Sequence, residues 1–221
     1  MNIRNFTFFL AFILLGTITP LHADYGYHFA GRGSTALVAT VVEFDVVVHA
    51  WPSVADCGIG CHVLGRGSLT SPDATEYAEF GIGCSFGGCS ETNLVWASHD
   101  KPGGQFFDEN IPLGTTVHVK AEKQTNRIRI TWSWIKPNGQ PDSRIKNVDT
   151  QDWEGVSAGY SPVYVEVHSY THPALTVHPQ EEHPPVDIEI SNITPITGVM
   201  VNDDPPYEAI GTVSNFSVVY P

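Results

Sequence analysis

The stretch that decides the fold runs from Glu76 to Cys89 and reads EYAEFGIGCSFGGC, and NLVWASH follows at positions 93 to 99. Alternation in the first part places Tyr77 and Glu79 on one side of an extended chain and apolar residues on the other. Glycines and two cysteines then form a loop, and a second apolar run begins after it. The stretch therefore predicts two strands joined by a cysteine-closed loop, with a carboxylate in the middle of the first strand.

The same two-residue period recurs along the chain. It is clear over 34–49, 115–122, 127–134 and 162–168, and weaker over 60–69, 76–82, 93–99, 186–191 and 211–220. Turn residues separate these segments at 71–73, 101–104, 137–139 and 203–206. No window has the period of an amphipathic helix, and 20 glycines with 16 prolines argue against long helices. About nine short strands predict an all-β fold, an antiparallel β-sandwich or jelly roll.

The first 23 residues are typical of an export signal. Arg4 supplies a positive charge, an apolar run extends over 8–18, and Ala23 is a small residue at the expected cleavage site. The apolar run is too short to span a bilayer comfortably, so we expect cleavage and no membrane insertion afterwards. Removing these residues leaves 198 of the 221, from 24 to 221, which we expect to form a single β-sandwich domain in a secreted or periplasmic location.

The charge of the chain excludes one class of partner. The formal net charge is −13, and it becomes −14 when Arg4 is removed with the signal. A chain this acidic repels phosphate backbones, so we expect no nucleic-acid partner. The acidity alone does not select a ligand.

The four cysteines form an even set in a chain that we expect to be exported. They are Cys57, Cys61, Cys84 and Cys89. An oxidising compartment favours two disulfides, and both the local pairing and the two crossed pairings remain open. A zinc site with four thiolates is the alternative, which the oxidising compartment disfavours.

Two glutamates are candidates for chemistry. Glu79 shares its side of the strand with Tyr77, and Glu166 shares its side with Tyr164 and His168. On a concave sheet such faces form the floor of a ligand groove, and two carboxylates there can divide the roles of acid and base. The alternative is that both are solvated residues on an outer sheet face.

Aromatic residues near these faces suit a binding surface, because sugar rings stack on exposed aromatic rings. The candidates are Tyr77, Trp96, Tyr164 and Tyr170. Trp132 and Trp134 instead alternate with isoleucines and are expected in the core.

Histidine is frequent, with ten in the chain. His168, His172, His178 and His183 lie near Glu166, Glu181 and Glu182, and imidazoles with carboxylates suit zinc or copper. Their spacing matches no compact ligand pattern, so we expect no bound metal and no cofactor. A histidine-rich metal-binding protein remains an alternative.

A resemblance to a known family adds to these interpretations. The segment 78–82, AEFGI, resembles the part of the glutamic peptidases that carries the first catalytic residue, which reads Gln-x-Gly-hydrophobic in fungal eqolisins and Glu-x-Gly-Trp in plant neprosin-like enzymes. Shorter similarities lie at 84–89, 111–114, 159–162 and 209–216. The resemblance implies a concanavalin A-like sandwich with Glu79 and Glu166 as the catalytic pair. The chain departs from the family at Ile82, and at Pro162, where the eqolisin glutamate would fall.

We therefore predict an exported β-sandwich that binds an extended glycan or polypeptide in a groove on one sheet. The alternative is an acid hydrolase of the glutamic-peptidase type, in which one glutamate activates water and the other protonates the leaving amine or polarises the carbonyl.

Overall fold

A computed structural model describes the greater part of the chain after residue 23. The described residues are 24–32, 37–51, 61–71, 76–85, 92–98, 101–150, 157–158, 163–171, 186–194, 201–202, 208–212 and 215–220. For β1 (Asp24–Arg32) and β12 (Val163–Thr171) the description covers the backbone. Residues 1–23, where we expect an export signal, lie outside it.

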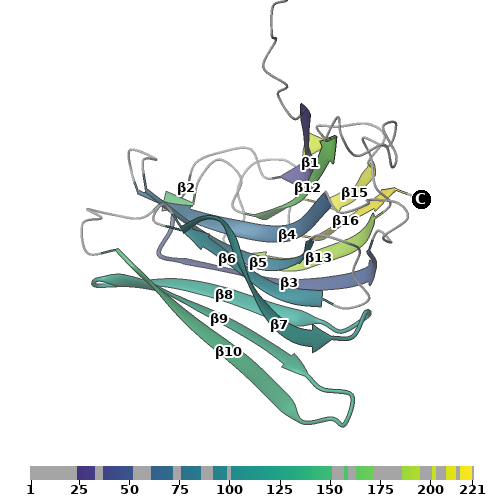
Figure 1. Cartoon of the computed structure of the whole chain (residues 1–221). Helices are drawn as coiled ribbons and strands as arrows, with labels where there is room; N and C mark the ends of the chain where they lie inside the picture. The colour runs from purple at the N-terminus through teal and green to yellow at the C-terminus, as the bar shows by residue number, and fades with distance from the viewer. Residues whose placement is uncertain are drawn as a thin grey trace, which may run out of the picture.

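The described residues form two antiparallel sheets (Figure 1). The nine-stranded sheet has the order β14-β1-β12-β4-β5-β6-β7, with β11 pairing with β2 and β4. Its other strands are β2 (Leu37–Val38), β4 (Cys61–Thr70), β5 (Tyr77–Ser85), β6 (Thr92–Ser98), β7 (Lys101–Ile111), β11 (Ser157–Ala158) and β14 (Val201–Asn202).

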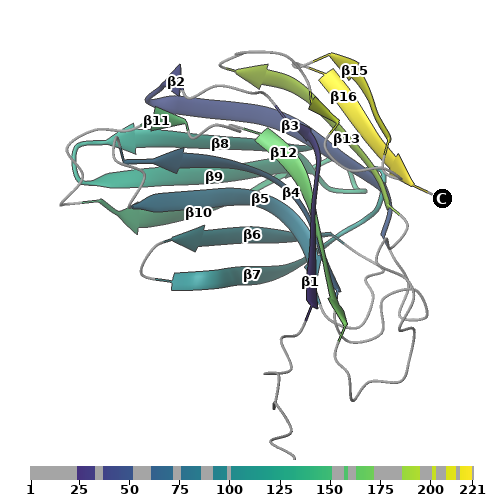
Figure 2. The ribbon, with the colours of Figure 1, turned by 90° about the horizontal axis from the view of Figure 1, so that it is seen from above.

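The seven-stranded sheet has the order β10-β9-β8-β3-β13-β16-β15. Its strands are β3 (Val41–Ala50), β8 (Val117–Gln124), β9 (Arg127–Ile135), β10 (Pro141–Asp149), β13 (Val186–Thr194), β15 (Glu208–Thr212) and β16 (Asn215–Tyr220). Figure 2 shows that β1 and β12 run at a steep angle to β4, β5, β6 and β7, so the nine-stranded sheet is strongly twisted. None of the described residues forms a helix that is long and apolar enough to cross a membrane.

Alternating burial explains why these segments are strands. On β3 the residues Val42, Phe44, Val46 and Val48 are buried, and the residues between them are more exposed. The same alternation holds on β8 and β9, where the apolar residues predicted to face inward are all buried. Strand existence and the buried face of these three strands are therefore confirmed, and the protein is an all-β antiparallel sandwich.

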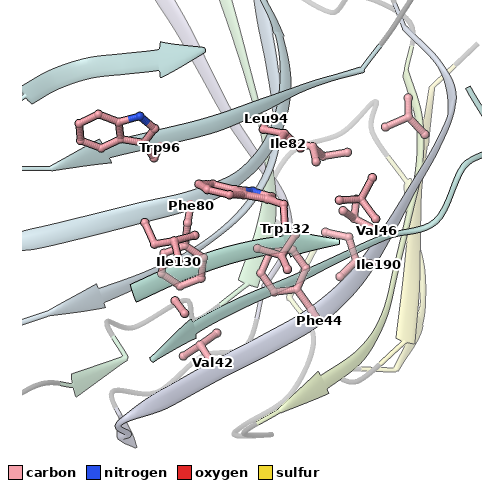
Figure 3. Packing of buried hydrophobic residues seen from close by; sticks show 14 of the residues in the cluster. Val42, Phe44, Val46, Phe80, Ile82, Leu94, Trp96, Ile130, Trp132 and Ile190 are labelled. Carbon is pink, nitrogen blue, oxygen red and sulfur yellow. The ribbon is translucent and has the colours of Figure 1, made fainter. Parts of the chain in front are cut away.

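The core lies between the two sheets (Figure 3). Phe44 of β3 stacks on Phe80 of β5, with ring centroids 6.5 Å apart. Trp132 of β9 is fully buried and donates its indole N–H to the carbonyl oxygen of Gly81 at 2.7 Å. Aromatic packing and one buried hydrogen bond therefore join the sheets directly behind the middle of β5.

The loop between β9 and β10 follows its sequence closely. The PNG motif at 137–139 predicts a turn, and the structure has one, with Gly139 at a φ of +79°. The Gly139 N–H donates to the Lys136 carbonyl at 2.8 Å, and the Lys136 N–H donates to the Gln140 carbonyl at 2.8 Å. This turn sets the register of the hairpin.

Several elements differ from the sequence-based expectation. The segment 211–220, expected as one strand, is divided between β15 and β16, which pair antiparallel, and β1 is not among the predicted strands. A turn is predicted at 101–104, but these residues begin β7, where Lys101 pairs with Ser98. β10 has no apolar alternation, because its inward positions carry Asp142, Arg144 and Lys146, opposite the core residues of β9. These charges lie at the open edge of the sandwich. There Asp142 pairs with Lys136 at 2.7 Å, Arg144 pairs with Glu109, and Lys146 lies 3.9 Å from the Trp96 ring centroid.

Candidate functional site

The β4–β5 pair places Arg66, Tyr77 and Glu79 on one side of the nine-stranded sheet. Arg66 lies opposite Gly81, and Ser68 lies opposite Glu79. Opposed residues of antiparallel strands share a side, and so do alternate residues along one strand. The core residues of β5 occupy the intervening positions and face the other sheet. We call the side that carries Arg66, Tyr77 and Glu79 the site side.

The connection between β4 and β5 holds this register. The Ser71 N–H donates to the Glu76 carbonyl at 2.9 Å, and the Glu76 N–H donates to the Ser71 side-chain oxygen at 3.0 Å. Both bonds lie immediately before Tyr77. The hairpin is therefore closed next to the residues that form the site.

Glu79 and Arg66 form an ion pair in which the Arg66 Nη1 lies 2.5 Å from the Glu79 Oε2. The Arg66 side chain is only 10% exposed and the Glu79 side chain only 21% exposed. Removing two charges from water costs several kcal/mol for each ion, and their mutual attraction offsets that cost only when the geometry is good. Within the described part of the chain, the other carboxylate oxygen, Oε1, accepts no hydrogen bond. The charges of Arg66 and Glu79 therefore offset each other at Oε2, and the Oε1 oxygen of Glu79 remains as a hydrogen-bond acceptor.

Gly81 is required where β4 and β5 approach each other closely. A Cβ at this position would lie 2.0 Å from the Gly65 carbonyl oxygen and 2.7 Å from the Arg66 Cα. Any side chain would force the two strands apart. Because Gly81 lies directly opposite Arg66, the missing side chain also leaves the Arg66 guanidinium room to reach Glu79. The Glu-x-Gly spacing of the sequence has this physical explanation.

Tyr77 belongs to the same electrostatic group. Burial raises the pKa of its hydroxyl above the ordinary value, the Glu79 carboxylate raises the pKa further, and the Arg66 guanidinium opposes both effects. The phenol therefore stays protonated at neutral pH and above. It provides a neutral hydroxyl that can donate one hydrogen bond and accept others.

β12 lies on the other side of β4 and brings further candidates to the same sheet. Tyr164 pairs with Arg66, and Glu166 pairs with Leu64. Alternation along β4 assigns these positions to the site side, the side of Glu79. The sheet thus places on one side, by register, two glutamates that are distant in the sequence.

The two glutamates are nevertheless not neighbours along the sheet. From Glu79 to Glu166 there are two strand spacings, about 10 Å, and four residues of β4, about 13 Å. The Arg66–Gly81 row lies between them. Among described residues, Arg66 is the ionisable side chain that contacts the Glu79 carboxylate.

His168 and Tyr170 continue along β12 away from Glu79. Position 168 pairs with His62 on β4, and position 170 pairs with Tyr25 on β1. Alternation gives both the same side of the strand as Glu166. Their contribution to a binding surface stays a prediction, because the side chains of β12 are outside the described part.

Trp96 is not on the site side, so the expectation that it lines the same surface as Glu79 is wrong. It pairs with Phe80, whereas Glu79 pairs with Ala97. Trp96 is 8% exposed, belongs to the core cluster, and has Lys146 over its ring. The sequence predicts a strand at 93–99. It does not predict which residues of β6 pair with which residues of β5, and that pairing decides the face of the sheet on which the indole lies.

Arg66 is the residue of the candidate site that sequence reasoning misses. The segment 60–69 is a weak strand candidate because glycines interrupt its alternation. The available signal is an arginine between Gly65 and Gly67 in a chain with only 11 lysines and arginines. A cation inside a glycine-rich strand implies a local partner, and the structure identifies that partner as Glu79.

Two of the four cysteines, Cys61 on β4 and Cys84 on β5, lie within the described residues, and Cys57 and Cys89 lie outside them. Cys84 is buried and disulfide-bonded, and the connectivity of the four cysteines stays a prediction. In the portion of the chain that is described, no group of three or more histidine, cysteine, aspartate or glutamate residues is placed to hold a metal ion. His172, His178 and His183 lie outside that portion, so the metal hypothesis also stays a prediction. Elemental analysis of dialysed protein would test it.

Comparison with known proteins adds the class of fold. No protein-family model and no curated protein matches the sequence. Among solved structures, two complexes of scytalido-glutamic peptidase match, one of them with a peptide-based transition-state analogue. Each has a TM-score of 0.52 and 9% sequence identity over 90% of this chain and 100% of the peptidase.

A further match is SCP-B, an eqolisin peptidase in complex with the tripeptide Ala-Ile-His. Its TM-score is 0.45 and its identity 8%, over 90% of this chain and 100% of that one. The two matches to scytalido-glutamic peptidase show that the protein resembles a glutamic peptidase in fold. The likeness to scytalido-glutamic peptidase extends along nearly the whole chain.

Proposed function

We propose that the protein is an exported β-sandwich that binds an extended polypeptide across the site side of β4 and β5. Glu79, Arg66 and Tyr77 form the centre of the binding surface. The observation that carries the proposal is the poorly exposed Arg66–Glu79 ion pair on the side of the sheet away from the core. A buried ion pair is weak evidence for a stabilising role, because apolar residues often stabilise such a position as well or better.

The chemistry of the three side chains suits an extended polypeptide. The Glu79 Oε1 is an acceptor for a ligand N–H, and the neutral Tyr77 hydroxyl bonds either an N–H or a carbonyl. Peptide groups present N–H donors at a regular spacing, so a chain lying across β4 and β5 offers a donor to the Glu79 Oε1. The scytalido-glutamic peptidase of the same fold was crystallised with a peptide-based analogue, which supports a polypeptide over a glycan.

Export is the second part of the proposal. The charge, apolar run and small residue within positions 1–23 favour a cleaved signal, and an even number of cysteines suits an oxidising compartment. Mass spectrometry of protein secreted by its host would give a mature chain starting at Asp24. An intact Met1 terminus in the mature protein would contradict this part of the proposal.

A peptide array and a glycan array, probed side by side with the purified mature chain, test the binding. We expect peptides to be retained, and affinity to fall about tenfold or more in the Glu79→Gln variant, since a charged acceptor is lost. The matched control is Glu189→Gln, a half-exposed glutamate on β13 of the other sheet. The proposal would be overturned if only glycans were retained, or if the Glu79→Gln protein bound peptides with the same affinity as the wild-type chain.

Acid hydrolysis is the second candidate, favoured by the register that brings Glu79 and Glu166 to one side of one sheet. In that function one carboxylate activates water and the other protonates the leaving amine. Digestion of casein at pH 3 by the wild-type chain and by Glu166→Gln tests it directly. Cleavage that disappears in the variant supports hydrolysis, and no cleavage by the wild-type chain leaves binding alone.

A further inference from the structure

The centre of the site is electrically neutral although the chain carries a formal charge of −13. Arg66 cancels the charge of Glu79 at 2.5 Å, and Tyr77 stays protonated. The described neighbours on the site side are uncharged as well, since Glu79 pairs with Ala97 and with Ser68. A ligand that reaches this point meets hydrogen-bonding groups rather than a net charge.

We infer that Arg66 determines specificity by making the site select an uncharged segment of its polypeptide ligand. This inference rests on the proposed function and adds the class of ligand residue. Without Arg66, the poorly solvated Glu79 carboxylate would require a cation from the ligand, such as a lysine or arginine side chain. With Arg66 in place, a ligand cation at Glu79 meets a carboxylate that is already paired, and a ligand carboxylate at this point would have to break the existing pair.

The structure also explains why a ligand does not displace Arg66. The side chain is 10% exposed and lies opposite Gly81, where no side chain fits. The guanidinium of Arg66 on β4 is therefore held against the Glu79 carboxylate of β5. This arrangement leaves the Oε1 oxygen for an N–H of the ligand while Oε2 remains with Arg66.

The test uses three peptides that differ only at the residue contacting the site, which is glutamine, lysine or glutamate. Their scaffold is the strongest binder from the peptide array, and a glutamine scan of that binder identifies the contacting residue. Affinities are measured at about 0.15 M salt, where a Debye length of about 8 Å suppresses attraction by the distant negative charges. The proteins are the wild-type mature chain, Arg66→Gln, Glu79→Gln and the double variant, each checked by circular dichroism.

We expect the wild-type chain to prefer the glutamine peptide. Arg66→Gln should shift preference toward the lysine peptide by about tenfold or more, and Glu79→Gln should shift it toward the glutamate peptide. The double variant should return to the glutamine peptide, because both charges are gone. Since the two single variants make opposite predictions, the inference stays testable if one of them fails to fold.

The outcomes separate the two proposals. Unchanged preferences in whichever single variants fold would overturn the role of Arg66 while leaving peptide binding intact. A wild-type preference for the lysine peptide would overturn it as well. If the wild-type chain binds no peptide on the array, the proposed function falls and this inference falls with it.

Discussion

The indole N–H of Trp132 donates to the carbonyl oxygen of Gly81 at 2.7 Å, across the two sheets. Gly81 is the residue of β5 that lies opposite Arg66, two positions after Glu79. The core of the sandwich thus anchors the backbone of the site from behind. Stability and site geometry are therefore coupled.

Replacing Trp132 by phenylalanine should lower the free energy of unfolding by about 2–4 kcal/mol, because a buried hydrogen bond and ring volume are lost together. Urea denaturation measures the loss. Trp134→Phe is the matched control, since Trp134 is a buried tryptophan of the same strand without this bond between the sheets. We expect the control to lose about 1–2 kcal/mol less. Equal losses would show that the bond to Gly81 contributes nothing measurable.

Gly81→Ala should destabilise the protein by about 3 kcal/mol or more, because the new Cβ collides with backbone atoms of β4 that cannot turn aside. Gly65→Ala is the comparison, since its Cβ would meet the Val46 methyl carbon Cγ2 at 3.3 Å, a contact that a small shift relieves. Thermal melts of both variants show which of the two is less stable. A Gly81→Ala protein as stable as Gly65→Ala would contradict the close approach of β4 and β5.

A double-mutant cycle tests the ion pair as a stability element. Arg66→Met and Glu79→Gln should each lower the free energy of unfolding by about 2–4 kcal/mol, because each change affects a poorly exposed pair and leaves its partner uncompensated. The double variant should lose less than the sum of the two, because it leaves neither charge unpaired. Additive losses in urea denaturation would mean that the two side chains do not interact in solution.

Tyr77 predicts a dependence of stability on alkaline pH. Its pKa is raised in the folded protein, first by burial and then by Glu79, so the folded state holds this proton more tightly than the unfolded state. The resulting contribution to stability is fully present below the ordinary tyrosine pKa of about 10 and declines as the pH rises through the higher folded value.

Tyr77→Phe removes this contribution. The stability of the wild-type chain relative to the variant should be constant between about pH 7 and pH 9 and should decrease above about pH 10. Urea midpoints at a series of alkaline pH values measure it. If the urea midpoints of the wild-type chain and of Tyr77→Phe changed in parallel up to pH 11, the pKa of Tyr77 would not be raised by folding.

Several features of the fold could be predicted because they depend on local pattern. Alternation on β3, β8 and β9 predicts their buried faces, and the PNG motif predicts the turn after β9. β10 could not be predicted in this way. The partners of its inward charges, such as Glu109 and Trp96, come from other strands at the open edge of the sandwich. An apolar pattern is absent where cross-strand charge pairs replace core packing.

The sequence alone determined that the chain is built of half-buried strands and that Tyr77 and Glu79 share one side of β5, because side-chain direction alternates within each strand. The tertiary structure decided what Glu79 meets. Strand order placed β4 between β5 and β12, and register put Arg66 beside Glu79 while setting Glu166 two rows away. Register between distant strands depends on the packing of the whole sheet, and a one-residue shift moves every side chain to the opposite face.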